Sequence, residues 1–174
     1  MSEIAEIPFN PEDFVEFSKI KDENIVLGIN IGMEIEAISR NFYQNIAIKL
    51  SPDKRFILKF LANEKLDHIR TLMAFQIALQ KSGNWISLSE KQLKRVRLPR
   101  LYDGKGSIPD IKEDASNVDI ILAAMRSEKR TEQFYKRIEK KVKDSKAKFF
   151  FSFLARFERA HYSLLKGLLE AAST

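Results

Sequence analysis

The chain of 174 residues contains no cysteine and only two histidines. The absence of cysteine excludes disulfides, catalytic thiols, cysteine-bound zinc and iron–sulfur clusters within these residues. Six glycines and five prolines are also too few for the many turns of a β-sandwich. Any metal or redox chemistry must therefore use carboxylates, the two imidazoles or a partner protein.

The sequence also lacks long apolar runs. The longest, 25–33 and 149–155, are far too short to span a bilayer. The first residues are acidic and lack the basic start and apolar core of a signal peptide. We therefore expect a cytoplasmic protein with no membrane partner.

The charge balance is basic, with a net charge of +6 that is concentrated in residues 91–100 and 136–148. The second cluster falls at the end of a predicted helix, where cations complement the helix dipole. Neither cluster is a basic stripe interleaved with aromatic residues or a known groove-reading motif. Nucleic acid is therefore not expected as a partner.

Four segments have helical hydrophobic spacing together with helical start and stop signals, at about 23–50, 51–81, 116–142 and 145–171. Short turns join them into two antiparallel hairpins, at about 20–81 and 116–171, linked by a long crossover at about 82–115. This connectivity predicts an all-α, ferritin-like four-helix bundle that occupies residues 1–174 as one domain.

The two hairpins repeat one another in sequence. Residues of the first helix recur at an offset of 92, where Glu36, Phe42, Tyr43 and Ile46 match Glu128, Phe134, Tyr135 and Ile138. Residues of the second helix recur at an offset of 93, where Phe60, Leu61, Ala62, His68 and Leu72 match Phe153, Leu154, Ala155, His161 and Leu165. The two histidines are thus equivalent positions of a duplicated hairpin.

These positions suit a metal centre. Glu158 and His161 are three residues apart, so both side chains leave the same face of their helix. Glu36 and Glu128 offer further carboxylates from the facing helices. Glutamates from two helices and Glu-x-x-His from the other two is the donor set of paired iron or manganese in carboxylate bundles. Oxygen and imidazole donors suit both metals.

On these motifs the chain resembles rubrerythrin-like members of the ferritin-like superfamily from about residue 20 to 171, apart from the crossover. The resemblance implies a non-haem di-iron protein that reduces peroxide or oxidises iron, with manganese or a mixed pair as further options. Full-length rubrerythrins add a cysteine-rich, electron-delivering domain. Because cysteine is absent, we expect this chain to lack that domain and to use an external electron-donor protein.

One residue departs from the pattern. The equivalent of Glu158 is Lys65, which cannot bind a metal ion while it is protonated. Three arrangements stay open. Glu64 could take the missing place beside His68 through a rotation or bulge. Alternatively, Lys65 could point inward and replace one metal, leaving one ion or none, or it could lose its proton and act as a ligand or carbamate.

The expected metal ligands are Glu36, Glu64, His68, Glu128, Glu158 and His161, and they hold two iron ions or only one. The expected catalytic residues are Glu36, Glu128, Tyr43 and Tyr135. The two tyrosines are core residues whose hydroxyl groups satisfy a carboxylate, or they relay electrons. The expected partners are a second copy of the chain, the electron donor, and peroxide or dioxygen. The competing prediction is a bundle with a degraded or mononuclear site that acts as a binding or structural protein.

Overall fold

The computed structural model describes residues 21–89, 111 and 114–172. It contains four helices: α1 (Glu23–Ala47), α2 (Pro52–Lys81), α4 (Asn117–Lys141) and α5 (Ser145–Ala172). These bounds confirm the four predicted helices to within a few residues. The described part of the chain has no strand. The predicted all-α, ferritin-like four-helix bundle is therefore confirmed.

The helix ends follow from local chemistry. The side chain of Asp22 accepts a hydrogen bond from the backbone N–H of Asn24 at the start of α1. Ser116 and Asp119 form a reciprocal capping box at the start of α4. Beyond the end of α2, Gly83 has a φ of +73°, a conformation that glycine adopts at no steric cost. The stop that the sequence predicts at Ser82–Gly83 and the start that it predicts at Ser116 thus coincide with observed helix ends, whereas a start signal at residues 10–13 lies outside the described residues.

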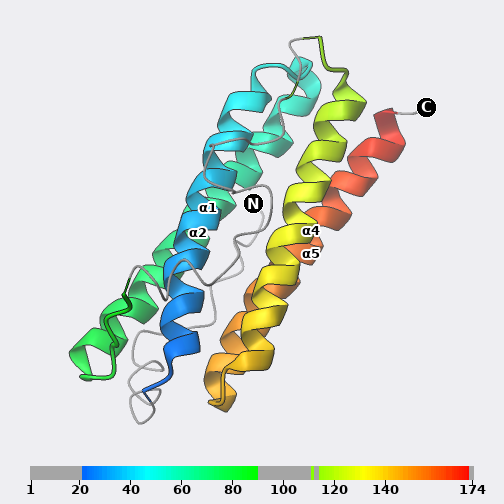
Figure 1. The fold of residues 1–174 in the computed structure, drawn as a ribbon. Coiled ribbons are helices and arrows are strands. Elements are labelled where there is room, and N and C mark those ends of the chain that lie inside the picture. The colour runs from blue at the N-terminus through cyan, green and yellow to red at the C-terminus, as the bar shows by residue number, and fades with distance from the viewer. Residues whose placement is uncertain (1–20, 90–110, 112–113, 173–174) are drawn as a thin grey trace, which may run out of the picture.

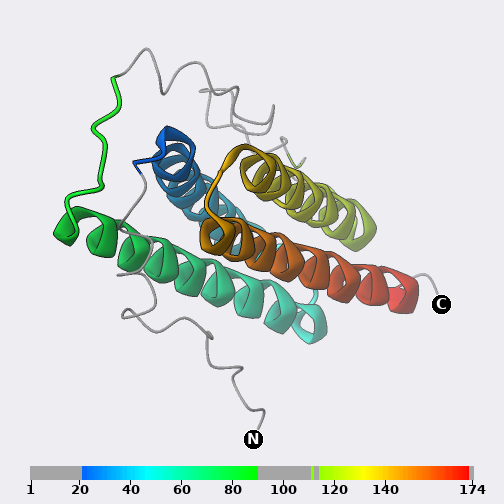
Figure 2. The same ribbon diagram turned by 90° about the horizontal axis from the view of Figure 1, so that it is seen from below.

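Each hairpin pairs its two helices along their length, α1 with α2 and α4 with α5 (Figure 1). Helix α2 ends at one end of the bundle and α4 begins at the other, so the chain between them must travel the length of the bundle. Figure 2 shows the hairpins packed side by side. Most of the predicted crossover, including the basic residues 91–100, lies outside the described residues.

The core is divided into two apolar clusters with a polar layer between them. One cluster contains the first part of α1, the second half of α2, the end of α4 and the first part of α5. The other contains the last part of α1, the first part of α2, the start of α4 and the last part of α5. Glu36, Lys65, Glu128 and Glu158 lie between these segments, and each has a relative exposure of 0%. The predicted site is therefore enclosed by apolar side chains on both sides.

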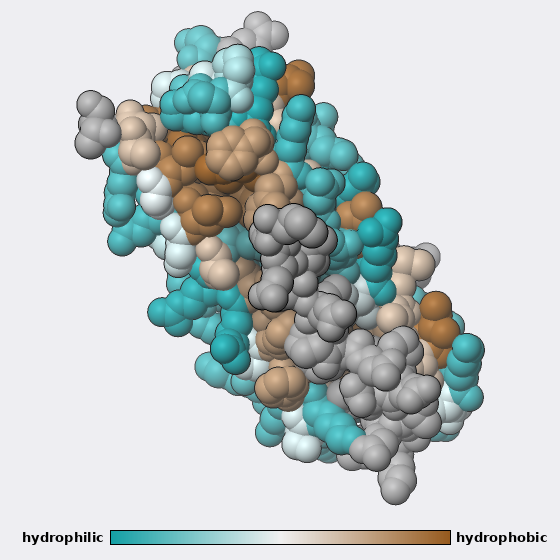
Figure 3. Space-filling view, turned by 180° about the vertical axis from the view of Figure 1, so that it is seen from behind, coloured by the Kyte–Doolittle hydropathy of each residue, from teal (hydrophilic) through white to brown (hydrophobic). Residues whose placement is uncertain are grey.

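No helix among the described residues is both long and apolar enough to cross a membrane. On the outer surface, apolar side chains gather on part of the face seen in Figure 3, among hydrophilic ones. Exposed large apolar residues include Phe56 and Phe60 on α2 and Phe149 and Leu164 on α5.

Candidate metal centre

Lys65 lies at the centre of the polar layer. Its ammonium nitrogen is 3.3 Å from Glu36 Oε2 and 3.0 Å from Glu128 Oε2, and it also donates to Glu158 Oε2. The three carboxylates come from α1, α4 and α5 and, like the lysine, are fully buried. Of the three arrangements left open by the sequence, the structure therefore has the inward-pointing lysine. We call this group the lysine–glutamate cage: Lys65, Glu36, Glu128 and Glu158.

The two histidines flank the cage. Nδ1 of His68 is 3.3 Å from Glu36 Oε1 and 3.1 Å from Glu158 Oε1. Nδ1 of His161 is 3.4 Å from Glu128 Oε2, within ion-pair distance but without hydrogen-bond alignment. The two rings stack with centroids 5.6 Å apart and planes inclined by 18°. Both imidazoles therefore turn one nitrogen toward the carboxylates.

The two tyrosines hold the cage glutamates from the opposite hairpin. Tyr135 on α4 donates its hydroxyl proton to Glu36 Oε1 on α1 at 2.7 Å. Tyr43 on α1 donates in the same way to Glu128 Oε1 on α4. Both tyrosines are fully buried. Each therefore satisfies a carboxylate, as expected, and the two bonds are related by the sequence repeat.

Burial and neighbouring charges shift the pKa of the cage residues in different directions. Burial alone would lower the pKa of Lys65, but Glu128, Glu158 and Glu36 raise it well above 10.5. Burial and the charge of Glu36 raise the pKa of Glu158 well above 4.5, which the lysine only partly offsets. The lysine is thus held as an ammonium ion, and Glu158 is the carboxyl that most readily keeps a proton.

The other two cage carboxyls are held in the ionised form. Burial would raise the pKa of Glu36, but Lys65, His68 and the Tyr135 hydrogen bond together lower it to about 2. Burial also opposes ionisation of Glu128, yet the lysine charge and hydrogen bonds lower its pKa to well below 4.5. Each of these two glutamates therefore offers an anion to whatever cation lies between them.

Glu64 lies outside the cage, although it precedes Lys65 directly in α2. Its side chain is 26% exposed, and its Oε2 is 3.7 Å from Nε2 of His161. The neighbouring imidazole of His161 lowers the pKa of Glu64. Burial would lower the pKa of His161, but Glu128 and Glu64 raise it. Glu64 therefore faces a histidine on α5, and it does not fill the place that Lys65 occupies.

Phe157 is a site residue that sequence reasoning missed. Its ring meets His68 edge-on at a centroid distance of 5.5 Å and His161 at 6.4 Å. Only its spacing signals this position, since it directly precedes Glu158 and lies four residues before His161 on α5. Phe157 limits the directions in which the two imidazoles can turn.

Three groups of side chains bring ligand atoms within 4.8 Å of one another among the described residues: Glu36, His68 and Glu158; Glu128, Glu158 and His161; and Glu64, His68 and His161. The first two share the cage carboxylates that already face the ammonium group. In a di-metal bundle all four helices supply a carboxylate, whereas here α2 supplies a cation. With Lys65 in this position, the cage residues do not fit a pair of metal ions.

Comparison with known proteins agrees with the fold and with the family that the sequence resembles. The family model described as Rubrerythrin matches residues 25–169, which include most of each of the four helices and every candidate ligand. No curated protein and no solved structure matches the chain. Together with the helical bundle and its clustered carboxylates and imidazoles, the match shows that the chain belongs to the rubrerythrin family.

Proposed function

We propose that this protein is a rubrerythrin-family bundle in which the ammonium group of Lys65 replaces the di-iron centre. The protein then acts as a binding or structural protein that holds one metal ion at most. The supporting observation is that Lys65 Nζ lies within 3.3 Å of oxygens of Glu36 and Glu128 and also donates to Glu158. A metal ion would need the same oxygens.

Charge explains why the lysine suits this place. Burying three carboxylates without a cation would be unfavourable in free energy. In a metal-binding bundle, a cation offsets this unfavourable term only while metal is bound. An ammonium ion tethered to α2 provides the cation permanently. The polar layer can therefore stay buried without a metal supply, which fits a structural or binding role.

A second candidate is favoured by the six carboxylate and histidine side chains that gather in one layer: Glu36, Glu64, His68, Glu128, Glu158 and His161. As this second candidate, the protein would be an oxidoreductase that reduces peroxide or oxidises iron and binds two metal ions, either iron or manganese. Glu36 and Glu128 would hold the metal ions, and Tyr135 and Tyr43 would orient those carboxylates by hydrogen bonds.

The oxidoreductase would need more than the cage provides. When bound, the metal pair would supply electrons to the oxidant, which is peroxide or dioxygen. An external electron-donor protein would then reduce the metal pair again. Before metal could enter, Lys65 would have to leave the carboxylates or lose its proton. Because its pKa is raised well above 10.5, proton loss at neutral pH is strongly unfavourable.

Anaerobic titration with iron(II), followed by peroxide addition, separates the two candidates. The proposed function predicts one bound ion at most and peroxide consumption no faster than that of free iron. Two bound ions per chain together with catalytic peroxide consumption or iron oxidation would refute the proposal and support the oxidoreductase.

We also propose that the protein forms a homodimer through α5. Phe149, Phe153 and Phe157 are spaced four residues apart on one face of that helix, and Phe149 is 57% exposed. Light scattering should then give twice the chain mass of 20.2 kDa, and Phe149→Glu should reduce it to the monomer mass. An unchanged dimer in the variant would exclude this face. A cytoplasmic location stays a prediction.

A further inference from the structure

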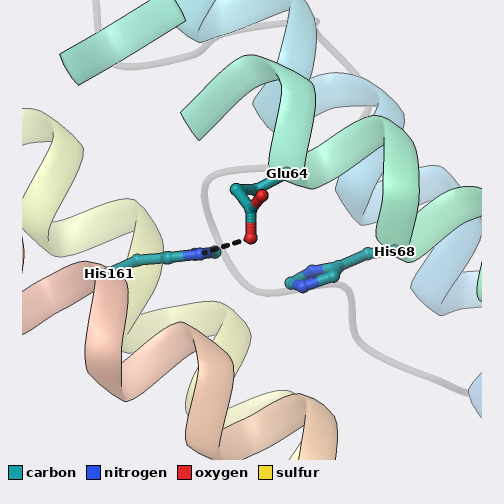
Figure 4. Close-up of side chains that lie close together, drawn as sticks. All are labelled: Glu64, His68 and His161. Atoms are coloured by element: carbon teal, nitrogen blue, oxygen red, sulfur yellow. Dashed lines mark ion pairs between the residues drawn. The ribbon is translucent and has the colours of Figure 1, made fainter. Parts of the chain in front are cut away.

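Glu64, His68 and His161 form a separate group at the edge of the polar layer. Glu64 and His68 come from α2 and His161 from α5, and the carboxylate of Glu64 lies between the two imidazole rings (Figure 4). One ligand atom from each residue lies within 4.8 Å of the other two. Lys65 is not a member of this group.

The spacing is close to that of a coordinated ion. Donor atoms bound at about 2.1 Å around a tetrahedral or octahedral metal are roughly 3.0–3.5 Å apart. Glu64 Oε2 and His161 Nε2 are already 3.7 Å apart. The ligand atom of His68 lies within 4.8 Å of both, and side-chain rotations would have to close the remaining separation.

His68 provides an independent reason to expect a ligand. Its side chain is only 6% exposed, and its Nε2 has no hydrogen-bond partner among the residues that the structure describes. Leaving a buried polar atom unpaired costs about 1–3 kcal/mol. Because Nδ1 of the same ring faces Glu36 and Glu158, Nε2 is directed away from the cage. A metal ion would satisfy this nitrogen.

The cage orients both histidines for this role. Metal-bound histidines commonly turn their other ring nitrogen toward a carboxylate, which fixes the tautomer and strengthens the ligand. Nδ1 of His68 lies 3.1 Å from Glu158, and Nδ1 of His161 lies 3.4 Å from Glu128. The cage carboxylates can thus support the ligands while they remain paired with Lys65.

Solvent access also favours metal binding by this group over metal binding in the cage. The side chain of Glu64 is 26% exposed, whereas the cage carboxylates are 0% exposed. An ion can therefore reach Glu64 from solvent without displacing the lysine. Two histidines and one carboxylate leave further coordination positions open for water or a small ligand, as in mononuclear iron(II) and zinc sites.

We propose that Glu64, His68 and His161 bind one divalent transition-metal ion through the Glu64 carboxylate and Nε2 of both histidines, outside the lysine–glutamate cage. The inference rests on the proposed function, since it gives a position to the single ion which that function allows. Iron(II), zinc and cobalt(II) all suit this donor set.

Cobalt(II) is the probe for the first test, because its visible absorption reports nitrogen and oxygen ligation. The wild-type chain should bind one cobalt(II) ion at neutral pH, and Glu64→Gln should weaken binding by about 10- to 100-fold or more. Asp67→Asn is the matched control, because Asp67 lies on the same helix with a 43% exposed side chain that pairs with Arg70. It should bind like the wild type. Thermal unfolding should show that both variants fold.

Zinc and ring-nitrogen NMR identify the ligating atoms. Bound zinc should shift the Nε2 resonances of both histidines, and Glu64→Gln should reduce those shifts at the same zinc concentration. Ligation through Nδ1, an unchanged affinity in Glu64→Gln, or no bound metal would overturn the inference while leaving the lysine-for-metal proposal intact. Two bound ions would overturn both.

Discussion

Replacing Lys65 with glutamate should convert the lysine–glutamate cage into an empty di-metal site. The substitution restores Glu-x-x-His on α2 and changes the buried charge by two units. Since the lysine has 0% exposure and faces three carboxylates, the metal-free variant loses its only cage cation and gains a fourth acid. Breaking a buried ion pair typically costs about 3–5 kcal/mol. At about 2–4 °C per kcal/mol for a domain of this size, Tm should fall by about 6–20 °C.

Bound metal should then restore the stability that the substitution removes. A ligand at 100 times its Kd stabilises the folded state by about 2.7 kcal/mol per site, so two manganese ions should recover the whole loss of about 3–5 kcal/mol. Lys65→Met is the matched control, because it removes the same ammonium group without adding a donor. Its metal-free form should also be destabilised, but manganese should rescue it less than the glutamate variant, because it lacks the fourth cage carboxylate.

Thermal unfolding followed by circular dichroism, with chelator and with manganese(II), measures both effects. The reasoning would be refuted if Lys65→Glu in chelator were as stable as the wild type. The reasoning would also be refuted if manganese stabilised the methionine variant as much as the glutamate variant, because the stabilisation would then not depend on the restored carboxylate.

Three further predictions concern a tyrosine that contacts the cage, a cage glutamate and two glycines. Tyr135→Phe removes a donor to an ionised glutamate and should lower the free energy of unfolding by about 1.5–3 kcal/mol in urea titrations, and an unchanged midpoint would contradict this. The pKa of Glu36 is lowered from 4.5 to about 2, so its contribution, on the order of 3 kcal/mol, is present above pH 4.5 and lost as pH falls toward 2. Glu36→Gln should therefore flatten the dependence of the unfolding free energy on pH over that range. A variant whose stability falls with pH as steeply as that of the wild type would exclude Glu36 as the source of this dependence. Gly28→Ala would place a Cβ 2.5 Å from Phe151 and should cost about 1–3 kcal/mol, whereas Gly167→Ala meets nothing within 4 Å and should stabilise by up to about 1 kcal/mol; equal effects would refute the packing argument.

The sequence was sufficient to predict the fold, because helix ends depend on local signals. Ser51 with Pro52, the Ser82–Gly83 pair and Ser116 each mark an end that the structure places within a residue or two. The repeat then placed both histidines in one layer and aligned Lys65 with Glu158. These relations depend on helical periodicity and on duplication, both of which are visible in one chain.

The arrangement inside the layer could not be predicted in the same way. Glu64 and Lys65 are adjacent, and both lie near the inward face of α2, so periodicity alone does not decide which one enters the cage. The choice depends on electrostatics across four helices, since three carboxylates favour a cation between them. Which nitrogen of His68 faces the carboxylates likewise depends on ring packing, including the contact with Phe157.

The lysine also makes the two halves of the duplicated chain unequal partners. Two copies of the α1–α2 hairpin would bring together two ammonium groups and only two carboxylates, and two copies of the α4–α5 hairpin would bring four carboxylates with no cation. Only a mixed pair combines one ammonium with three acids. A single substitution in one copy of an ancestral repeat would thus have prevented that hairpin from assembling with a second copy of itself. Its folding would then have depended on the other hairpin.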